Sequence, residues 1–380
     1  MPLTIVFYST IGGFQGGVER FLFQAAQALQ AAGVECRGVF DFPGRDTDLF
    51  RTPFATVDFG ADALARRCSG ADWLWLHKCR DCTAAAALPG RIPTAVYVHD
   101  HDYYCFRRHK YLPINRINCP LPCGPYCLPC GLTAARQARW RDFRRNLAFV
   151  RQADLVLAGS DYMLGNLIAN GFPPKRLRKL SPLVDCQPSP PLAGRGQPPT
   201  SRPGEILSVG QVIRGKGVDL LLQAVARLSC PWHLTVVGEG GDLDFCRRLA
   251  GRLGIADRVD FPGFVLAPGR FYRQAAVMAF PSRWQEPFGM TGPEAMAAGV
   301  PVVAFDVGGV REWLHHDRNG ILVPAKDIRA FSSALESLLT DQETASRLGR
   351  QGAVDMTAFT SLEFSRQVTS ILANCDLAHR

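Results

Sequence analysis

The sequence predicts an α/β protein with two doubly wound domains, each a parallel β-sheet with helices on both faces. Short apolar runs of strand length alternate with amphipathic helical runs along nearly the whole chain, which is typical of parallel sheets. The chain has 380 residues, 47% of them hydrophobic, enough for two cores because one core seldom grows beyond about 250 to 300 residues. A stretch rich in Pro, Gly and Ser near the middle separates two alternating halves.

Residues 1–188 are predicted to form the first domain. Its clearest strands are TIVFYS, DWLWLH, TAVYVH and DLVLAG. The run VERFLFQAAQALQAA, which follows the first strand, carries apolar residues at helical spacing. Residues 189–204 lack an apolar period and are predicted to be a linker.

Residues 205–355 are predicted to form the second domain. Its strands are EILSVG, WHLTVVGE, VMAFPS and PVVAF, again separated by helical runs. Doubly wound domains bind ligands at the carboxyl ends of their strands. We therefore expect two Rossmann-like domains that face each other across a ligand-binding cleft.

Composition points to a cytoplasmic protein. No segment reaches about 18 uninterrupted apolar residues, so no transmembrane helix is expected. The first residues, MPLTIVFYST, lack a charged region and pass directly into a strand, so a signal peptide is not expected either. Thiols in the cytoplasm are expected to be reduced.

Two carboxylates, Glu286 and Glu294, bracket the stretch EPFGMTGPE. A strand-like run precedes Glu286, and a helical run begins near Pro293, a residue that suits the first position of a helix. Free amides at a helix N-terminus bind anions such as phosphate, and ionised carboxylates accept hydrogen bonds from sugar hydroxyls. The amides expected there belong to Phe288, Gly289 and Met290. In the alternative interpretation Glu294 only complements the positive helix end and Glu286 is solvated.

The run from FPSRWQEPFGM to NGILVP is one of several motifs that occur in a fixed order. The others are GGVER (16–20), VHD (98–100), ADLVLAGSDY (153–162), VGQVIRGKGVDLLLQAV (209–225), VVGEGGD (236–242) and DRVDFPGFV (257–265). Together they span most of the chain and resemble the retaining glycosyltransferases of family 4, which have the two-domain GT-B fold. The resemblance implies a retaining, metal-independent hexosyltransferase that moves a sugar from a UDP- or GDP-sugar, and a final helix, 356–380, that crosses back to the first domain.

The resemblance also implies roles for individual residues. Lys216, in RGKG, is expected to compensate the charge of the leaving diphosphate. Family members usually carry an arginine where this chain has Gln211, and Arg214 is the candidate to replace it. Gly16 and Gly17 are expected to add amide donors and room for close approach of the substrate.

Further expected contacts surround the sugar and the base. His99 follows the strand TAVYV and is the first catalytic candidate, beside Glu286 and Lys216. Glu286 is expected to orient sugar hydroxyls and Glu294 to bind the ribose. The base is expected to be read through the backbone of Gly263, Phe264 and Val265. A nucleotide-sugar hydrolase or epimerase on the same fold is the nearest alternative function.

A competing interpretation involves Asp100 and Asp102. They form a D-x-D sequence after a strand, the signature with which another glycosyltransferase fold holds a divalent metal on the diphosphate. Two other D-x-D strings occur in the chain, so the pattern arises easily. With Lys216 available for the charge, no cofactor is expected for the donor chemistry.

Four of the 13 cysteines lie within NCPLPCGPYCLPCG, in a loop at 100–135, and Cys105 lies upstream. In a reducing compartment, clustered cysteines point to a metal before a disulfide. The four could bind a structural zinc ion or an iron-sulfur cluster, or remain free thiols packed in a loop insertion. They are Cys119, Cys123, Cys127 and Cys130.

Charge suggests an anionic partner. Residues 100–185 hold 14 Lys and Arg against 6 Asp and Glu, most of the net charge of +9. The stretch ARQARWRDFRRNLAFVRQ has the pattern of a basic amphipathic helix, which suits either the inner face of a membrane or an ordinary solvated surface. A lipid-linked acceptor would explain both features, as part of surface-polysaccharide or glycoconjugate synthesis. A nucleic-acid-binding protein with a cysteine-bound metal would also be basic, but would not need the Glu286–Glu294 site.

Overall fold

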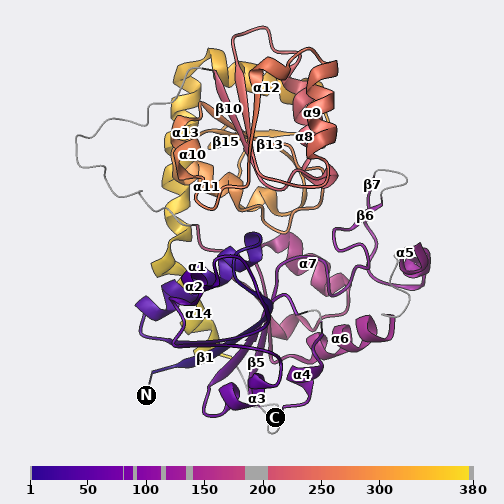
Figure 1. Cartoon of the computed structure of the whole chain (residues 1–380), viewed down its shortest axis with the longest axis vertical. Coiled ribbons are helices and arrows are strands. Elements are labelled where there is room, and N and C mark those ends of the chain that lie inside the picture. The colour runs from indigo at the N-terminus through magenta and orange to yellow at the C-terminus, as the bar shows by residue number, and fades with distance from the viewer. Residues whose placement is uncertain are drawn as a thin grey trace. The chain divides into compact units, whose positions relative to one another are not determined.

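The structure is a computed structural model that describes residues 2–79, 81–88, 92–112, 117–133, 140–184 and 204–375. The chain forms two compact units (Figure 1). Unit 1 comprises Met1–Leu183 and Ser361–Arg380, and unit 2 comprises Val184–Thr360. The predicted linker lies outside the described residues except for Gly204.

Unit 1 contains a parallel sheet of seven strands in the order β3-β2-β1-β4-β5-β8-β9. The order reverses direction between β1 and β4, and the carboxyl ends of strands at such a reversal are the usual ligand site of a doubly wound sheet. The strands are β1 (Thr4–Gly12), β2 (Glu35–Pro43), β3 (Thr56–Phe59), β4 (Trp73–Leu76), β5 (Thr94–Val98), β8 (Leu155–Ala158) and β9 (Leu177–Lys179).

Helices cover both faces of this sheet because successive strand residues point to opposite sides. Ile5 and Phe7 of β1 pack into one core cluster, and Val6 and Tyr8 pack into another. The first cluster lies under α1 (Gly17–Ala31), α2 (Thr47–Arg51) and α14 (Ser361–Ala373); the second lies under α3 (Ala63–Cys68), α4 (Thr83–Ala86), α6 (Trp140–Gln152) and α7 (Asp161–Ala169) (Figure 1).

The last helix, α14, therefore belongs to unit 1. Ser365 Oγ of α14 donates a hydrogen bond to the Ala28 carbonyl of α1 at 2.8 Å. Phe364 meets Phe21 of α1 edge to face, with ring centroids 5.7 Å apart. The chain thus returns from unit 2 to complete the first core.

A long connection between β5 and α6 carries the cysteine-rich loop. Its described part includes a small antiparallel hairpin, β6 (Tyr111–Leu112) with β7 (Ile117–Asn118). A 3₁₀ turn at Pro125–Cys127 follows and leads into the short helix α5 (Leu128–Thr133).

Unit 2 contains a parallel sheet of six strands in the order β12-β11-β10-β13-β14-β15, which is the Rossmann arrangement. The order reverses direction between β10 and β13. The strands are β10 (Glu205–Val209), β11 (His233–Val237), β12 (Val259–Gly263), β13 (Val277–Phe280), β14 (Val302–Phe305) and β15 (Gly320–Val323).

Central strands of unit 2 are buried on both faces, which explains their continuous apolar runs. Val302, Val303 and Ala304 of β14 are all fully buried. One face of the sheet carries α8 (Val218–Val225), α9 (Leu243–Arg252) and α12 (Ile328–Thr340); the other carries α10 (Gly269–Gln274), α11 (Thr291–Ala297) and α13 (Gln342–Met356) (Figure 1). The prediction of two doubly wound, Rossmann-like domains is confirmed.

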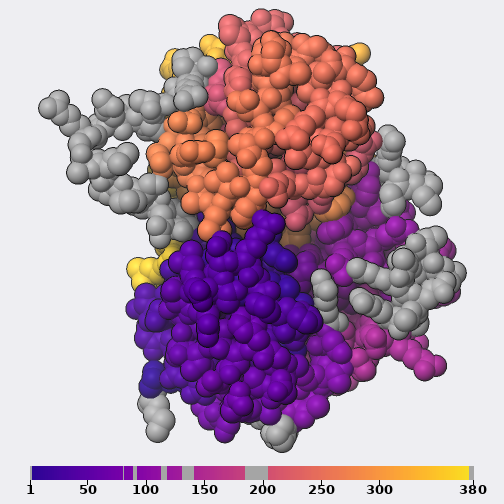
Figure 2. Space-filling model, in the orientation of Figure 1, coloured from indigo at the N-terminus to yellow at the C-terminus, as the bar shows by residue number. Residues whose placement is uncertain are grey.

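Each unit draws its surface from particular parts of the sequence. On the face shown in Figure 2, unit 1 is covered largely by its N-terminal residues, in indigo and purple, and unit 2 by residues in orange from its second half. Among the described helices, none is both long enough and apolar enough to cross a membrane.

Candidate active site

The sheet reversal of unit 2 brings together two of the predicted site residues. Lys216 follows β10 and Glu286 follows β13, the two strands on either side of the reversal. Lys216 Nζ lies 2.7 Å from Glu286 Oε1, and the Ser282 hydroxyl donates to the same oxygen. These two hydrogen bonds hold the Glu286 side chain in place, and the residue is only 5% exposed.

Glycines bring the two loops into direct contact. A Cβ at Gly215 would lie 1.7 Å from the Trp284 ring, so only glycine fits beneath that side chain. Gly217 has φ of +74°, and a Cβ there would lie 1.9 Å from the Pro281 carbonyl oxygen. The Arg283 amide also donates to the Gly215 carbonyl at 2.9 Å. This packing fixes the backbone on both sides of the Lys216–Glu286 pair.

A third loop, after β14, supports Glu286 from its backbone. The Gly309 amide donates to the Glu286 carbonyl at 2.7 Å, and the Gly308 amide donates to Gln285 Oε1 at 3.1 Å. The sequence-based prediction did not include Ser282 or these two glycines. The glycine pair in DVGGV, which directly follows a strand, was the sequence signal from which a loop at this position could have been predicted.

Glu294 lies apart from that pair, on α11. The helix begins at Thr291, earlier than expected, so Pro293 is its third residue and still within the first turn. The Tyr272 hydroxyl donates to Glu294 Oε2 at 2.8 Å, and Glu294 is only 7% exposed. Between the two carboxylates, Gly289 has φ of +91° and the Phe288 carbonyl accepts the Trp313 indole proton at 2.7 Å.

Arg214 points to a different set of partners. Its guanidinium lies 3.5 Å from Asp219 and over the Phe245 ring at 5.2 Å. Asp219 is also paired with the buried Arg283. Lys216, and not Arg214, is therefore the cation that meets Glu286.

Residues 263–265 lie at the same edge of the sheet, at the end of β12. Gly263 has φ of +84°, and the Phe264 amide lies 3.4 Å from Glu239 Oε1. Glu239 follows β11, the strand next to β12. The Phe264 side chain is 42% exposed, which leaves it accessible to a ligand.

In unit 1, His99 pairs with a second histidine. His99 follows β5 and His77 follows β4, and His99 Nε2 lies 3.0 Å from His77 Nδ1. Removal from water lowers the pKa of His99 to about 3, and burial lowers the pKa of His77 well below its ordinary value. Both rings are therefore neutral at pH 7. His77 was absent from the sequence-based prediction, although it ends a strand-like run as His99 does.

The two D-x-D carboxylates are neutralised by cations of this chain. Lys78 Nζ lies 2.7 Å from Asp100 and 3.6 Å from Asp102, and Arg108 lies 3.6 Å from Asp102. Burial and the adjacent Asp100 carboxylate raise the pKa of Asp102. Burial opposes ionisation of Asp100 as well, but the Lys78 ammonium holds its pKa below the ordinary value.

Gly16 and Gly17 lie at the start of α1, close to these groups. Gly16 precedes the helix, and the Glu19 carboxylate lies back toward it, since a Cβ at Gly16 would be 3.5 Å from Glu19 Oε2. Burial raises the pKa of Glu19, which nearby Lys78 counteracts. Phe21 of α1 meets the His99 ring at 5.0 Å, so unit 1 gathers its predicted site residues at one edge of the sheet.

The predicted basic helix is present as α6, but its apolar side chains are used in packing. Leu147 and Val150 are buried in the core of unit 1, and Phe143 stacks on Phe106 at 4.0 Å. Arg141, Arg144 and Arg145 of α6 are exposed. The described part of the helix thus offers charge, not an apolar face, to a partner.

Comparisons with known proteins agree with this architecture. Residues 15–188 match the model "Glycosyltransferase Family 4" and residues 195–355 match "Glycosyl transferases group 1". The structure of Anabaena Alr3699/HepE in complex with UDP and glucose superposes with a TM-score of 0.77 at 19% identity, over 98% of this chain and 99% of that one. The chain is therefore a GT-B protein of the glycosyltransferase class. The first of its two halves matches family 4.

Curated relatives match over part of their length. The D-inositol 3-phosphate glycosyltransferase of Kribbella flavida is 30% identical over 250 residues, 59% of each chain. The GDP-mannose-dependent alpha-(1-6)-phosphatidylinositol monomannoside mannosyltransferase of Mycobacterium tuberculosis is 30% identical over 226 residues, 54% of this chain and 57% of that protein. The match thus spans less than two thirds of these relatives.

Proposed function

We propose that this protein is a retaining glycosyltransferase that moves a sugar from a nucleoside diphosphate sugar to an acceptor in glycan or glycolipid synthesis. The observation that carries the proposal is the Lys216–Glu286 pair at the sheet reversal of unit 2. It combines a cation for the leaving diphosphate with a carboxylate for the sugar. The match of both halves to glycosyltransferase models supports it, as do relatives whose names describe sugar transfer.

The two carboxylate oxygens of Glu286 have different surroundings, which suits the binding of a sugar hydroxyl. Both of its hydrogen bonds, from Lys216 and Ser282, go to Oε1. Within the described residues no group bonds to Oε2, so this oxygen remains to accept a sugar hydroxyl. Lys216 Nζ carries three protons and uses one on Glu286, which leaves donors for a phosphate. In this proposal the pair holds the sugar and the leaving group side by side.

Retention of configuration follows from a front-face reaction in this proposal. The bond from the anomeric carbon to the phosphate oxygen breaks, and the leaving phosphate takes the proton of the acceptor hydroxyl as the new bond forms on the same face. Lys216 stabilises the charge that develops on the diphosphate. The neutral His99, held at Nε2 by His77, offers a hydrogen bond rather than a charge to the sugar.

Donor binding is proposed to need no divalent metal. A metal at Asp100 and Asp102 would have to displace Lys78 and Arg108, whose charges already balance the two carboxylates. Its place on the diphosphate is taken by Lys216.

The acceptor is proposed to be anionic and lipid-linked. The exposed arginines of α6 follow the loop after His99 and suit an acceptor phosphate or the anionic face of a membrane. Lipopolysaccharide and phosphatidylinositol transferases among the relatives support this choice. Donor identity is open between UDP- and GDP-sugars; the HepE structure contains UDP, whereas the mycobacterial relative is GDP-mannose-dependent.

The test is a donor screen followed by a transfer assay. One nucleoside diphosphate should raise the melting temperature more than the others, because a ligand that binds only the native state stabilises it. With the matching donor and a lipid extract as acceptor, NMR of the product should show the anomeric configuration of the donor. A short treatment with EDTA should leave the rate unchanged. Loss of activity that Mg²⁺ reverses would instead favour Asp100 and Asp102 as metal ligands, and turnover of donor without any acceptor would favour a hydrolase or epimerase.

Glu294 is proposed to bind the ribose. Glu294→Gln should raise the Kd for the nucleoside diphosphate by about 10-fold or more, since losing a charged hydrogen bond costs about 1.5 to 3 kcal/mol. The kcat should change little because the ribose does not react. Tyr272→Phe, which removes the partner hydroxyl and keeps the carboxylate, is the matched control and should have the smaller effect. An unchanged Kd in Glu294→Gln would remove this residue from the site.

A further inference from the structure

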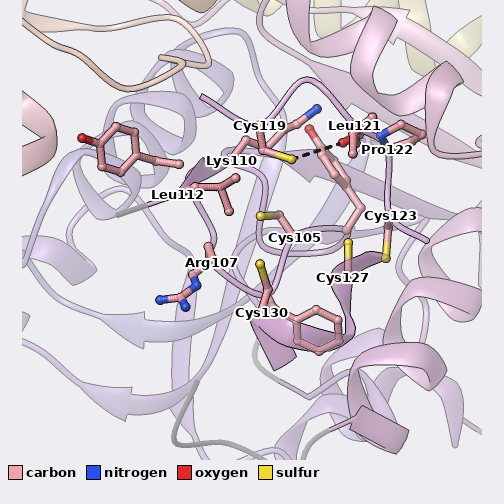
Figure 3. Close-up of a pocket in the computed structure, with 13 residues that line it drawn as sticks. Cys105, Arg107, Lys110, Leu112, Cys119, Leu121, Pro122, Cys123, Cys127 and Cys130 are labelled. Atoms are coloured by element: carbon pink, nitrogen blue, oxygen red, sulfur yellow. Dashed lines mark hydrogen bonds between the residues drawn. The ribbon is translucent and has the colours of Figure 1, made fainter. Parts of the chain in front are cut away.

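Five cysteines line one pocket in the loop between β5 and α6. The four predicted from the sequence are joined by Cys105, and their sulfur atoms gather around the same space (Figure 3). The five are Cys105, Cys119, Cys123, Cys127 and Cys130. Cys79 and Cys82 lie elsewhere, in the core beneath α3 and α6. The reaction proposed above involves no cysteine, so this cluster of five thiols has no role in it.

The loop backbone holds these cysteines in a defined arrangement. The Cys119 amide donates to the Lys110 carbonyl at 2.6 Å, which joins the two ends of the β6–β7 hairpin. The Cys123 amide donates to Asn170 Oδ1 at the end of α7, at 2.7 Å. The Cys127 amide donates to the Gly124 carbonyl at 2.9 Å within the 3₁₀ turn. Segments distant in sequence are thereby tied around the pocket.

Cys105 is fixed by its own backbone at the start of the loop. Its amide donates to the His101 carbonyl at 2.8 Å, and its carbonyl accepts from the Arg108 amide at 2.9 Å. Cys119, Cys123 and Cys127 line the same pocket as Cys105, whereas Cys130 lies within the short helix α5.

Lys110 adds a buried positive charge beside the thiols. The residue is only 5% exposed, and its ammonium donates to Asn166 Oδ1 at 2.7 Å. Within the described residues no carboxylate pairs with it. A lysine is rarely buried without a charge to balance, and a zinc ion with four thiolates would supply a net charge of about −2.

We propose that Cys105, Cys119, Cys123 and Cys127 bind one zinc ion, with Lys110 balancing part of the charge and Cys130 outside the coordination sphere. Binding converts four thiols to thiolates and releases their protons to solvent. Within the described residues no three His, Cys, Asp or Glu side chains yet converge closely enough to hold a metal, so the ion must draw the sulfurs inward. The zinc fixes the loop that begins directly after His99 and Asp100.

The experiment measures metal in the full chain purified without chelators. Elemental analysis should find about one zinc per chain. Serine at Cys105, Cys119, Cys123 or Cys127 should each reduce the zinc content at least about 10-fold, because only a thiolate is a strong ligand here. Cys130→Ser, in the same loop, and Cys230→Ser, in unit 2, are the matched controls and should keep the wild-type content. Exchange of zinc for cobalt should give the strong visible absorption of tetrahedral thiolate-bound cobalt.

A separate control shows whether each variant is folded, independently of its metal content. The melting-temperature rise caused by a nucleoside diphosphate, a ligand assigned to unit 2, should persist in every variant that is folded. For a variant that does not fold, treating the wild-type protein with a thiol-modifying reagent in the presence of a zinc-binding dye should release about one zinc per chain.

Three results would overturn the proposal. Wild-type protein with less than about 0.1 metal per chain and five freely reactive thiols would leave the pocket without an ion. Iron with sulfide in place of zinc would identify an iron-sulfur cluster. Zinc that survives Cys105→Ser but is lost in Cys130→Ser would replace the proposed ligands with the four cysteines of the NCPLPCGPYCLPCG motif.

Discussion

Replacing Lys216 with alanine is expected to lower kcat/KM by about 10²- to 10³-fold, the usual loss when one donor to developing charge is removed. In the proposed reaction Lys216 is the cation that meets the leaving diphosphate, and its charge matters most as the bond breaks. The kcat should therefore fall more than KM rises. Steady-state kinetics with the donor identified by thermal shift provides the measurement.

Two further variants separate the phosphate contact from its alternatives. Arg214→Ala should cost less than about 10-fold, because Arg214 is engaged with Asp219 and Phe245. Lys216→Ala also leaves Glu286 without its cation, so the double variant with Glu286→Gln is informative. If the loss arises only from an unpaired Glu286, the double variant should regain activity. If Arg214→Ala is the more damaging single change, Arg214 replaces the arginine missing at Gln211.

Glu286→Gln is expected to lower kcat by about 10- to 100-fold with little change in the Kd for the nucleoside diphosphate. Glutamine keeps the shape of the side chain but loses the charge that strengthens a hydrogen bond to a sugar hydroxyl, a loss of about 1.5 to 3 kcal/mol. Ser282 and Lys216 can still donate to the amide oxygen, so the loops should remain in place. Kinetics and nucleotide titration on the same preparation give both numbers.

The control for this variant is Glu343→Gln, an exposed carboxylate in the first turn of α13. It should leave both kcat and the Kd within about 2-fold of wild type. Wild-type kcat in Glu286→Gln would contradict the assignment of this carboxylate to the sugar.

Much of the fold was predictable because parallel strands buried on both faces have continuous apolar sequences. VVAF and WLWL could be recognised for that reason. The strand β3 was not predicted: it is an edge strand, and its four residues, TVDF, are all half-buried. Its residues do alternate between polar and apolar, but a run of only four alternating residues, without a continuous apolar stretch, is too short to identify a strand with certainty from the sequence.

The candidate site was predictable where a motif is local, and less so where it depends on tertiary structure. Glu286 and Glu294 lie in one continuous stretch that can be read directly. The contact between Lys216 and Glu286 joins residues 70 positions apart and depends on the order of β10 and β13. His77 was missed as the partner of His99 for the same reason, since the two histidines are 22 positions apart and follow different strands.

The return of α14 to unit 1 affects the order in which the protein can mature during synthesis. Phe364, Val368 and Leu372 belong to the core beneath α1, yet the ribosome adds them only after all of unit 2. Until then α1 lacks the helix that packs against it, and Phe21 lacks its edge-to-face contact with Phe364. Unit 2 is continuous in sequence and can fold first, although it is translated second. The core of unit 1 therefore cannot be completed until the C-terminal helix α14 has been synthesised.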